Sequence, residues 1–91
     1  MVLISYDISD NKKRAIFSKY LKKFGNRLQF SVFQIENSNR VLNNIISDIE
    51  NVFSKNFDEA DSVLILKLSS SCKVLRFGYA AHEDSELLIV K

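Results

Sequence analysis

Residues Val2 to Arg14 read VLISYDISDNKKR, and this stretch decides the fold. The apolar run Val2–Ile8 predicts a short strand that carries a carboxylate, Asp7, near its end. Because nearly every residue of the run is apolar, we expect a central strand that is covered on both faces. Asp10 then precedes a basic run. An acid at a strand end beside cations is suited to holding a divalent metal and a phosphate together.

The period changes from two to 3.6 after this strand, which predicts a helix over Asn11–Phe24. Ser9 or Asp10 can cap its first turn, and Gly25 stands where a helix end favours a left-handed residue. The apolar stripe of this helix consists of Ile16, Phe17, Tyr20, Leu21 and Phe24.

The next stretch, RLQFSVFQI at Arg27–Ile35, alternates as a strand does. Leu28, Phe30 and Val32 form one set, whereas Phe33 and Ile35 begin a set of the other parity. This change of parity predicts one bent strand or two short strands that meet at a bulge near Ser31.

A second helix follows, capped by Asn37 and Ser38, and a strand is predicted over Ser62–Leu68. The wide apolar stripe of the helix consists of Val41, Leu42, Ile45, Ile46, Ile49, Val52 and Phe53. Val74–Phe77, ending at Gly78, and Leu87–Val90 are further strand candidates.

The order βαββαβ plus a short C-terminal strand predicts an α+β, ferredoxin-like two-layer sandwich, with residues 1–91 as a single domain. Both helices must then cover one face of the sheet. The apolar residues of the first and last long strands cannot all point at the helices, so the other face should be apolar as well. Such a patch favours a homodimer, in which Leu87–Val90 is a candidate to pair with the partner's sheet edge.

Composition limits the function further. The chain has no Pro and two Gly, which excludes a Gly-rich phosphate loop, and Cys72 is alone, so no internal disulfide forms. No apolar run approaches membrane-span length, and Met1 leads straight into the first strand without a leader, so we expect a cytoplasmic protein without membrane contact. Residues 1–40 carry eight basic and three acidic side chains, a net charge of +5, which favours an anionic partner.

Asp7 is the candidate metal ligand. Mg²⁺ is held by one or two carboxylates together with waters and substrate phosphates, and a two-fold axis near the strand end would supply a second Asp7. The alternative is that Asp7 only helps to cap the following helix.

Arg14 and Arg27 are the candidate phosphate ligands, since guanidinium groups suit bidentate contact with phosphate. Sequence-independent attraction to a nucleic-acid backbone would come from the lysines of the first helix, Lys12, Lys13, Lys19, Lys22 and Lys23. Alternatively, each lysine only keeps the surface soluble.

Other candidates have weaker support from the sequence. Ser31 could orient a water or bond a phosphate, and Tyr6 and Phe33 suit the core with an exposed edge at most. His82 lacks a partner at metal or triad spacing, and Cys72 lacks a CxxC motif or a nearby His.

Taken together, YDISDNKKR, then Gly25-Asn26-Arg27, then Gln29 to Phe33 (QFSVF), resemble the second of the CRISPR-associated spacer-acquisition families (Cas-two). The similarity is close over Met1–Glu36, and the tail from Ser69 onward departs most from the family pattern.

The resemblance implies a ferredoxin-like homodimer whose two Asp7 side chains face each other, with Mg²⁺-dependent endonuclease activity on RNA or double-stranded DNA. It also implies a dimer that bridges the CRISPR integrase and holds spacer-precursor DNA, a role for which the nuclease residues are dispensable. The site residues that it carries over are Tyr6, Asp7, Arg14, Arg27, Ser31 and Phe33.

Two alternatives stay open at the level of sequence. A toxin-type ribonuclease shares the fold and the strand-end Asp. A non-catalytic dimeric ferredoxin-like sensor would need a pocket with convergent polar groups, for which the sequence gives no sign.

Overall fold

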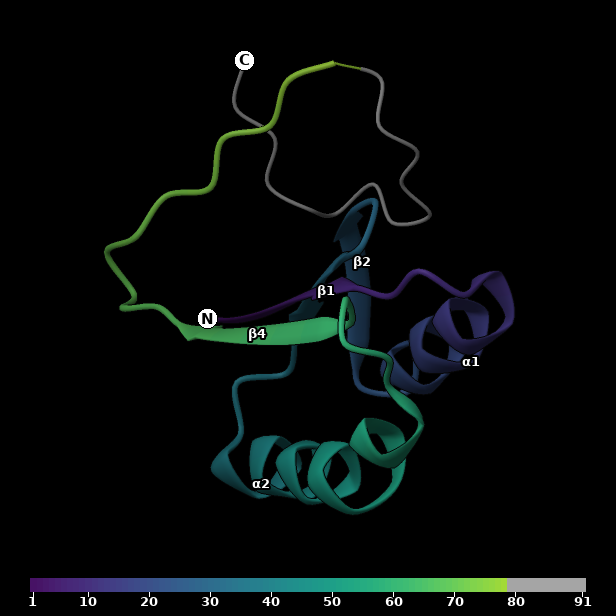
Figure 1. Ribbon diagram of the computed structural model, residues 1–91. Helices are drawn as coiled ribbons and strands as arrows, with labels where there is room; N and C mark the ends of the chain where they lie inside the picture. The colour runs from purple at the N-terminus through teal and green to yellow at the C-terminus, as the bar shows by residue number, and fades with distance from the viewer. Residues whose placement is uncertain (79–91) are drawn as a thin grey trace.

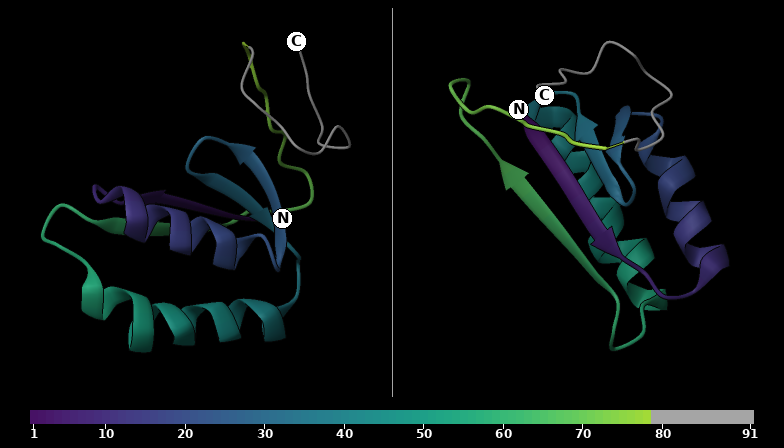
Figure 2. Two further views of the ribbon diagram at one scale, coloured as in Figure 1. Left: turned by 90° about the vertical axis from the view of Figure 1, so that its right-hand side faces the viewer. Right: turned by 90° about the horizontal axis from the view of Figure 1, so that it is seen from above.

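Strand β1 (Val2–Asp7) lies at the centre of the sheet in the computed structural model, which describes residues 1–78. The strand order is β2 (Gly25–Gln29), β3 (Val32–Ile35), β1 and β4 (Ser62–Lys67), and each neighbouring pair is antiparallel. Two helices cover one face, which gives the two layers of a ferredoxin-like α+β sandwich (Figures 1 and 2). The fold class predicted from the sequence is confirmed.

The remaining elements follow in the predicted order. They are α1 (Asn11–Leu21), β2 (Gly25–Gln29), β3 (Val32–Ile35), α2 (Asn39–Asp48), a π-helical turn (Ile49–Phe53), a 3₁₀ turn (Ser54–Asn56) and β4 (Ser62–Lys67). The last predicted apolar turn of the second helix is thus π-helical, and the apolar stripe continues through it to Phe53.

The core lies between the sheet and the helices. Val2, Ile4 and Tyr6 of β1 are buried because alternate residues of a strand point to one face. The Phe17 ring of α1 meets Tyr6 edge-on at 5.2 Å between centroids and Phe53 at 5.0 Å. Tyr20 completes the contact between the helices by donating a hydrogen bond to the carboxylate of Asp48.

The helix starts are set by side-chain caps. The Asp10 carboxylate accepts from the Lys13 backbone N–H at 2.9 Å, and Ser38 Oγ accepts from the Val41 N–H at 3.3 Å. Each cap satisfies one of the backbone donors that a helix start leaves unpaired. Of the two residues predicted for each cap, Asp10 and Ser38 are therefore the ones used.

Gly25 does not end the first helix, so that prediction is wrong. Gly25 is the first residue of β2, and α1 already ends at Leu21. A Cβ atom on Gly25 would lie 2.0 Å from the Gln34 carbonyl oxygen. Glycine is needed here because two strand backbones approach closely, not because of a left-handed conformation.

The stretch predicted as one bent strand or two short ones is a hairpin of two strands. Phe30 and Ser31 form its turn, and Ser31 adopts a positive φ of 65°. The irregularity of the pairing lies between Arg27 and Gln29 rather than at Ser31. Leu28, in the middle of that irregularity, is buried, whereas Phe30 is exposed.

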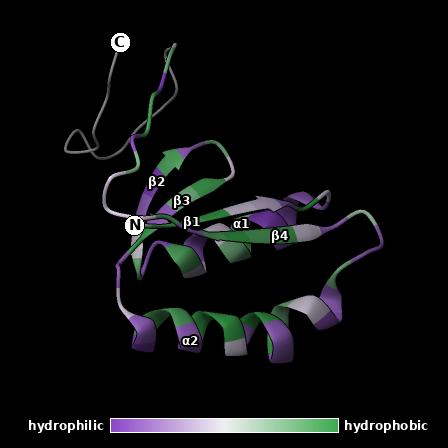
Figure 3. Cartoon of the chain, turned by 90° about the vertical axis from the view of Figure 1, so that its left-hand side faces the viewer, coloured by the Kyte–Doolittle hydropathy of each residue, from purple (hydrophilic) through white to green (hydrophobic). Residues whose placement is uncertain are grey.

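The face of the sheet opposite the helices is apolar, as expected. Leu64 and Leu66 of β4 are exposed there beside Leu3 of β1 (strands in Figure 3). β1 is therefore covered by helices on one face only, which corrects the expectation of cover on both.

The segment after β4 runs on the side of the sheet away from the helices (Figure 1). Residues 74–77 are not a strand there, so the Val74–Phe77 prediction is wrong; the segment has no hydrogen-bonded neighbour strand within residues 1–78. Leu87–Val90 and His82 lie outside the described residues. Over the described part of the chain, no helix is long and apolar enough to cross a membrane.

Gly25→Ala should destabilise the fold, because the new methyl group would push β2 from the Gln34 carbonyl oxygen. We expect a loss of about 1–3 kcal/mol in the free energy of unfolding, measured by urea denaturation at fixed protein concentration. Asn26→Ala, an exposed change in the same strand, is the control. Equal midpoints for the two variants would contradict this role of Gly25.

Candidate nucleic-acid site

A polar cavity of about 230 Å³ lies between α1 and the β2–β3 hairpin. Its lining residues are Tyr6, Asn11, Arg14, Ala15, Ser18, Arg27 and Phe30. Four of them come from one stripe of α1 at the spacing i, i+3, i+4 and i+7, so a single helix face forms one wall. We call this cavity the arginine pocket.

Arg14 is held near the N-terminal end of α1 by two hydrogen bonds. Its Nη1 donates to the Ile8 carbonyl oxygen at 2.9 Å, and its Nη2 donates to Asn11 Oδ1. The Ile8 carbonyl belongs to the segment that follows β1, so Arg14 lies on the side where the strand ends. A guanidinium fixed in this way is preorganised for a ligand.

Arg27 reaches the same pocket from β2. Its Nη2 donates to Ser18 Oγ at 3.1 Å, and its guanidinium carbon lies 5.2 Å from the centroid of the Phe33 ring. A cation over an aromatic face is attracted by the ring quadrupole. Phe33, fully buried, thus supports Arg27 from beneath.

The electrostatics of the pocket favour an anion. Neither Arg14 nor Arg27 forms an ion pair with a carboxylate of residues 1–78, and no acid is among the lining residues. Burial raises the pKa of Tyr6 above its usual 10.0, although Arg27 and the hydrogen bond with Ser18 act in the opposite direction. Tyr6 therefore stays a neutral phenol near neutral pH, and no carboxylate of residues 1–78 offsets the two cations.

Asp7 does not line the arginine pocket. Successive side chains of a strand point to opposite faces, so Tyr6 faces the helices and the exposed Asp7 lies on the open face, across from Ser62 of β4. Within residues 1–78 its carboxylate makes no hydrogen bond, and Asp10 caps α1 instead. The alternative that Asp7 is a helix cap is therefore wrong.

A single exposed carboxylate fits one ligand position of Mg²⁺, which also takes waters and substrate phosphates. The described residues include no group of three metal-ligating side chains from His, Cys, Asp or Glu. Within residues 1–78, Asp7 therefore offers only part of a metal site.

The remaining residues singled out from the sequence, among residues 1–78, lie in the core, in the hairpin turn or on the surface. Tyr6 and Phe33 are core residues, as expected. Ser31 lies in the hairpin turn, where its carbonyl oxygen accepts from the Tyr6 backbone N–H at 3.0 Å. Cys72 is an exposed free thiol.

The lysines of the first helix segment do not act as one group. Lys12 and Lys19 are exposed on α1, seven residues apart and hence on one face. Lys13 points elsewhere: its Nζ donates to the Asn56 carbonyl oxygen at 2.6 Å and lies 4.0 Å from the Asp58 carboxylate. Lys22 and Lys23 follow the end of α1, and Lys23 Nζ lies 6.0 Å from the Tyr20 ring centroid.

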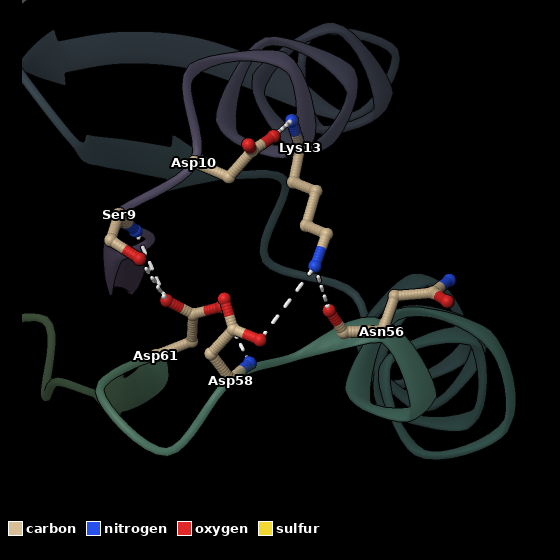
Figure 4. Close-up of polar contacts among 6 residues, drawn as sticks. All are labelled: Ser9, Asp10, Lys13, Asn56, Asp58 and Asp61. Carbon is tan, nitrogen blue, oxygen red and sulfur yellow. Dashed lines mark hydrogen bonds and ion pairs between the residues drawn. The ribbon is translucent and has the colours of Figure 1, made fainter.

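The loop after β1 is fixed by the carboxylate of Asp61, which directly precedes β4 (Figure 4). Asp61 Oδ1 accepts from the Ser9 backbone N–H at 3.0 Å and from Ser9 Oγ at 3.2 Å. Asp61 Oδ2 accepts from the Asp58 backbone N–H at 2.9 Å. These bonds tie the loop between Asp7 and Arg14 to the start of β4.

Four pocket residues were not predicted from the sequence: Asn11, Ala15, Ser18 and Phe30. The helical spacing of the first three with Arg14 was a usable signal. Phe30 gave none, because an aromatic residue in an alternating stretch equally suits a buried strand position.

The fold and the pocket together define a small ferredoxin-like protein with a cationic pocket beside the end of its first strand. The family model described as CRISPR associated protein Cas2 matches residues 1–74, and the chain belongs to this family. The resemblance noted in the sequence is thereby confirmed.

Known relatives agree with this assignment. The chain is 32% identical over 77 residues to "CRISPR-associated endoribonuclease Cas2" of Mycobacterium tuberculosis, and the match covers 85% of this chain. It is 28% identical over 79 residues to "CRISPR-associated endoribonuclease Cas2 4" of Rhodospirillum rubrum. The chain spans slightly less than two thirds of these relatives, with 65% and 61% of their lengths covered.

Solved structures of other proteins have a fold similar to that of this chain. A hypothetical protein, TT1823, from Thermus thermophilus has a TM-score of 0.66 and 26% identity, with 90% of this chain and 95% of that chain covered. Cas2 of Streptococcus pyogenes, at pH 6.5, has a TM-score of 0.59 and 25% identity, with 77% and 87% covered.

Asp61 should contribute to stability in a pH-dependent way. Hydrogen bonds from the Asp58 and Ser9 backbone lower its pKa from 3.8. A carboxyl whose pKa is lowered on folding stabilises the fold above its unfolded pKa, and this contribution is lost as pH falls through the folded value. Wild type should therefore be more stable than Asp61→Asn at pH 7, and the gap should narrow below 3.8.

Thermal unfolding across this pH range measures the gap. Asp58→Asn is the control, because among residues 1–78 the Asp58 carboxylate contacts only Lys13, at 4.0 Å, and its backbone N–H is retained. A gap that is the same at pH 7 and pH 3 would contradict the role of the Asp61 charge.

Proposed function

We propose that this chain is the subunit of a homodimeric CRISPR adaptation protein that grips nucleic-acid phosphates in the arginine pocket and carries a Mg²⁺-dependent endonuclease site at paired Asp7 residues. The observation that carries the proposal is the convergence of Arg14 and Arg27 on one pocket without a carboxylate partner in residues 1–78. Two uncompensated guanidinium groups suit a phosphodiester, whose two unesterified oxygens accept from such a fork.

The dimer is supported by the open face of the sheet. Leu64 and Leu66 are 58% and 39% exposed there, next to Leu3. Apolar side chains gathered on one face of a small domain favour burial against a second copy. Because Asp7 lies on the same face, packing two sheets about a two-fold axis would bring both carboxylates to one interface.

Each of the proposed site residues has a separate role in the proposed cleavage. The two Asp7 carboxylates would hold Mg²⁺, which when bound lowers the pKa of a coordinated water and polarises the phosphoryl oxygen. Arg14 and Arg27 would hold a phosphate of the same strand and so orient the backbone. Tyr6, Ser31 and Phe33 would act by positioning: the Ser31 carbonyl fixes the end of β1 and Phe33 supports Arg27.

The wider role belongs to the assembled dimer. We propose that it bridges the CRISPR integrase and holds double-stranded spacer-precursor DNA, with the exposed Lys12 and Lys19 of α1 adding attraction to the backbone. The relatives are named endoribonucleases, so RNA is the first substrate to assay for cleavage. The adaptor role requires only the cationic surface, whereas cleavage requires Asp7 as well.

Asp7→Asn should abolish Mg²⁺-dependent cleavage of RNA, because the amide keeps the shape but loses the charge that holds the metal. The loss should be at least about a hundredfold, measured on a labelled oligonucleotide. Dimer mass by light scattering and nucleic-acid binding in EDTA should match wild type. Cleavage at the wild-type rate would remove Asp7 from the proposed metal site.

Lys12→Ala with Lys19→Ala should weaken capture of duplex DNA, because both lysines are exposed on one face of α1. The slope of log K against log salt concentration is negative, and its magnitude should decrease by about one for each phosphate that is no longer neutralised. Fluorescence anisotropy measures this slope. Lys13→Ala is the control, since Lys13 is bound to Asn56 and Asp58. A larger effect of the control than of the pair would contradict this assignment of the lysines.

A further inference from the structure

Phe30 is a large aromatic side chain that the structure leaves exposed at the surface. It is 71% exposed, in the turn of the β2–β3 hairpin, and it lines the arginine pocket. Every other aromatic residue at the pocket or beneath it is buried: Tyr6 is 4% exposed and Phe33 is fully buried. Phe30 is therefore the one aromatic lining residue, among those of the described chain, whose ring a ligand can reach.

The turn that carries Phe30 is fixed rather than loosely attached. Ser31, the next residue, adopts a φ of 65°, and its carbonyl oxygen accepts from the Tyr6 backbone N–H at 3.0 Å. A non-glycine residue in the left-handed region persists only where its surroundings hold it. This bond pins the turn to the end of β1, which keeps Phe30 beside the two arginines.

The pocket and the ring accept different parts of one ligand. The cavity of about 230 Å³ can hold a phosphate group, since a water molecule occupies about 30 Å³ of the liquid. The two guanidinium groups supply the charge. The exposed ring adds a flat apolar surface at the rim, and the π-face of any nucleobase can stack on such a surface.

We propose that Phe30 is a stacking platform for an unpaired base, whose adjoining phosphate is held between Arg14 and Arg27. This inference rests on the proposed function and deepens it, since it assigns a residue of the pocket that selects among its nucleic-acid ligands. A base within a duplex is already stacked on its neighbours and cannot present its face. Phe30 is thus a specificity-determining residue that separates single-stranded from duplex ligands.

Fluorescence of a single-stranded hexanucleotide that contains one 2-aminopurine tests the proposal, with the full chain in EDTA to prevent cleavage. Stacking on wild type should change the 2-aminopurine emission on binding. Phe30→Ala should weaken binding of the single strand about tenfold and abolish that change. Phe30→Trp should preserve both, and Phe30→Leu, apolar but not flat, should behave like Phe30→Ala.

Two controls make the result specific. Phe77→Ala removes a side chain that is equally exposed, at 70%, but does not line the pocket, and it should bind like wild type. A duplex of the same sequence, with both ends closed by short tethers so that no terminal base face is free, should bind wild type and Phe30→Ala equally.

The outcomes separate this inference from the proposed function. If Phe30→Ala binds the single strand as wild type does, while Arg14→Ala and Arg27→Ala bind weakly, stacking is wrong and the phosphate pocket stands. If wild type binds neither strand nor duplex at low salt, the proposed function itself fails. If Phe30→Ala alters the dimer mass and weakens strand and duplex alike, Phe30 is a subunit contact and the inference is overturned.

Discussion

The alternation of side chains along β1 is the constraint on which the rest of the structure depends. Val2, Ile4 and Tyr6 enter the core beneath the helices, and therefore Leu3 and the strand-end Asp7 must face the other way. A shift of one residue in the pairing would exchange the two faces. Antiparallel partners on both sides of β1 fix its register, so the place of the carboxylate follows from the packing of the core.

The same alternation separates two chemical functions in space. The carboxylate proposed to hold metal lies on the open face, whereas the two arginines lie beside α1 and the hairpin. A nucleic acid that used both would have to pass around the end of β1. The loop at this end must therefore keep a fixed conformation. Asp61 holds it by accepting both hydrogen bonds that Ser9 donates.

Buried aromatic side chains connect this site to the helices. The Tyr6 ring packs edge-on against Phe17, which in turn contacts Phe53 in the π-helical turn after α2. Phe33 lies under Arg27 at 5.2 Å, so a core residue sets the position of a surface cation. Substitutions in this aromatic cluster should affect stability and the phosphate binding proposed for the arginine pocket together, since the same rings support the core and Arg27.

The element order, two candidate cap residues for each helix and the cationic surface came from the sequence, because period, capping chemistry and charge are local properties. The sequence also indicated Asp7, Arg14 and Arg27 as candidate site residues. Only the tertiary structure decided that Gly25 is a close-approach residue, that Lys13 is bound to the far end of the second helix, and that Phe30 reaches the arginine pocket. These three contacts depend on which backbones and side chains come together in the folded chain. Contacts between residues far apart in the sequence produce no periodic pattern from which they could be predicted.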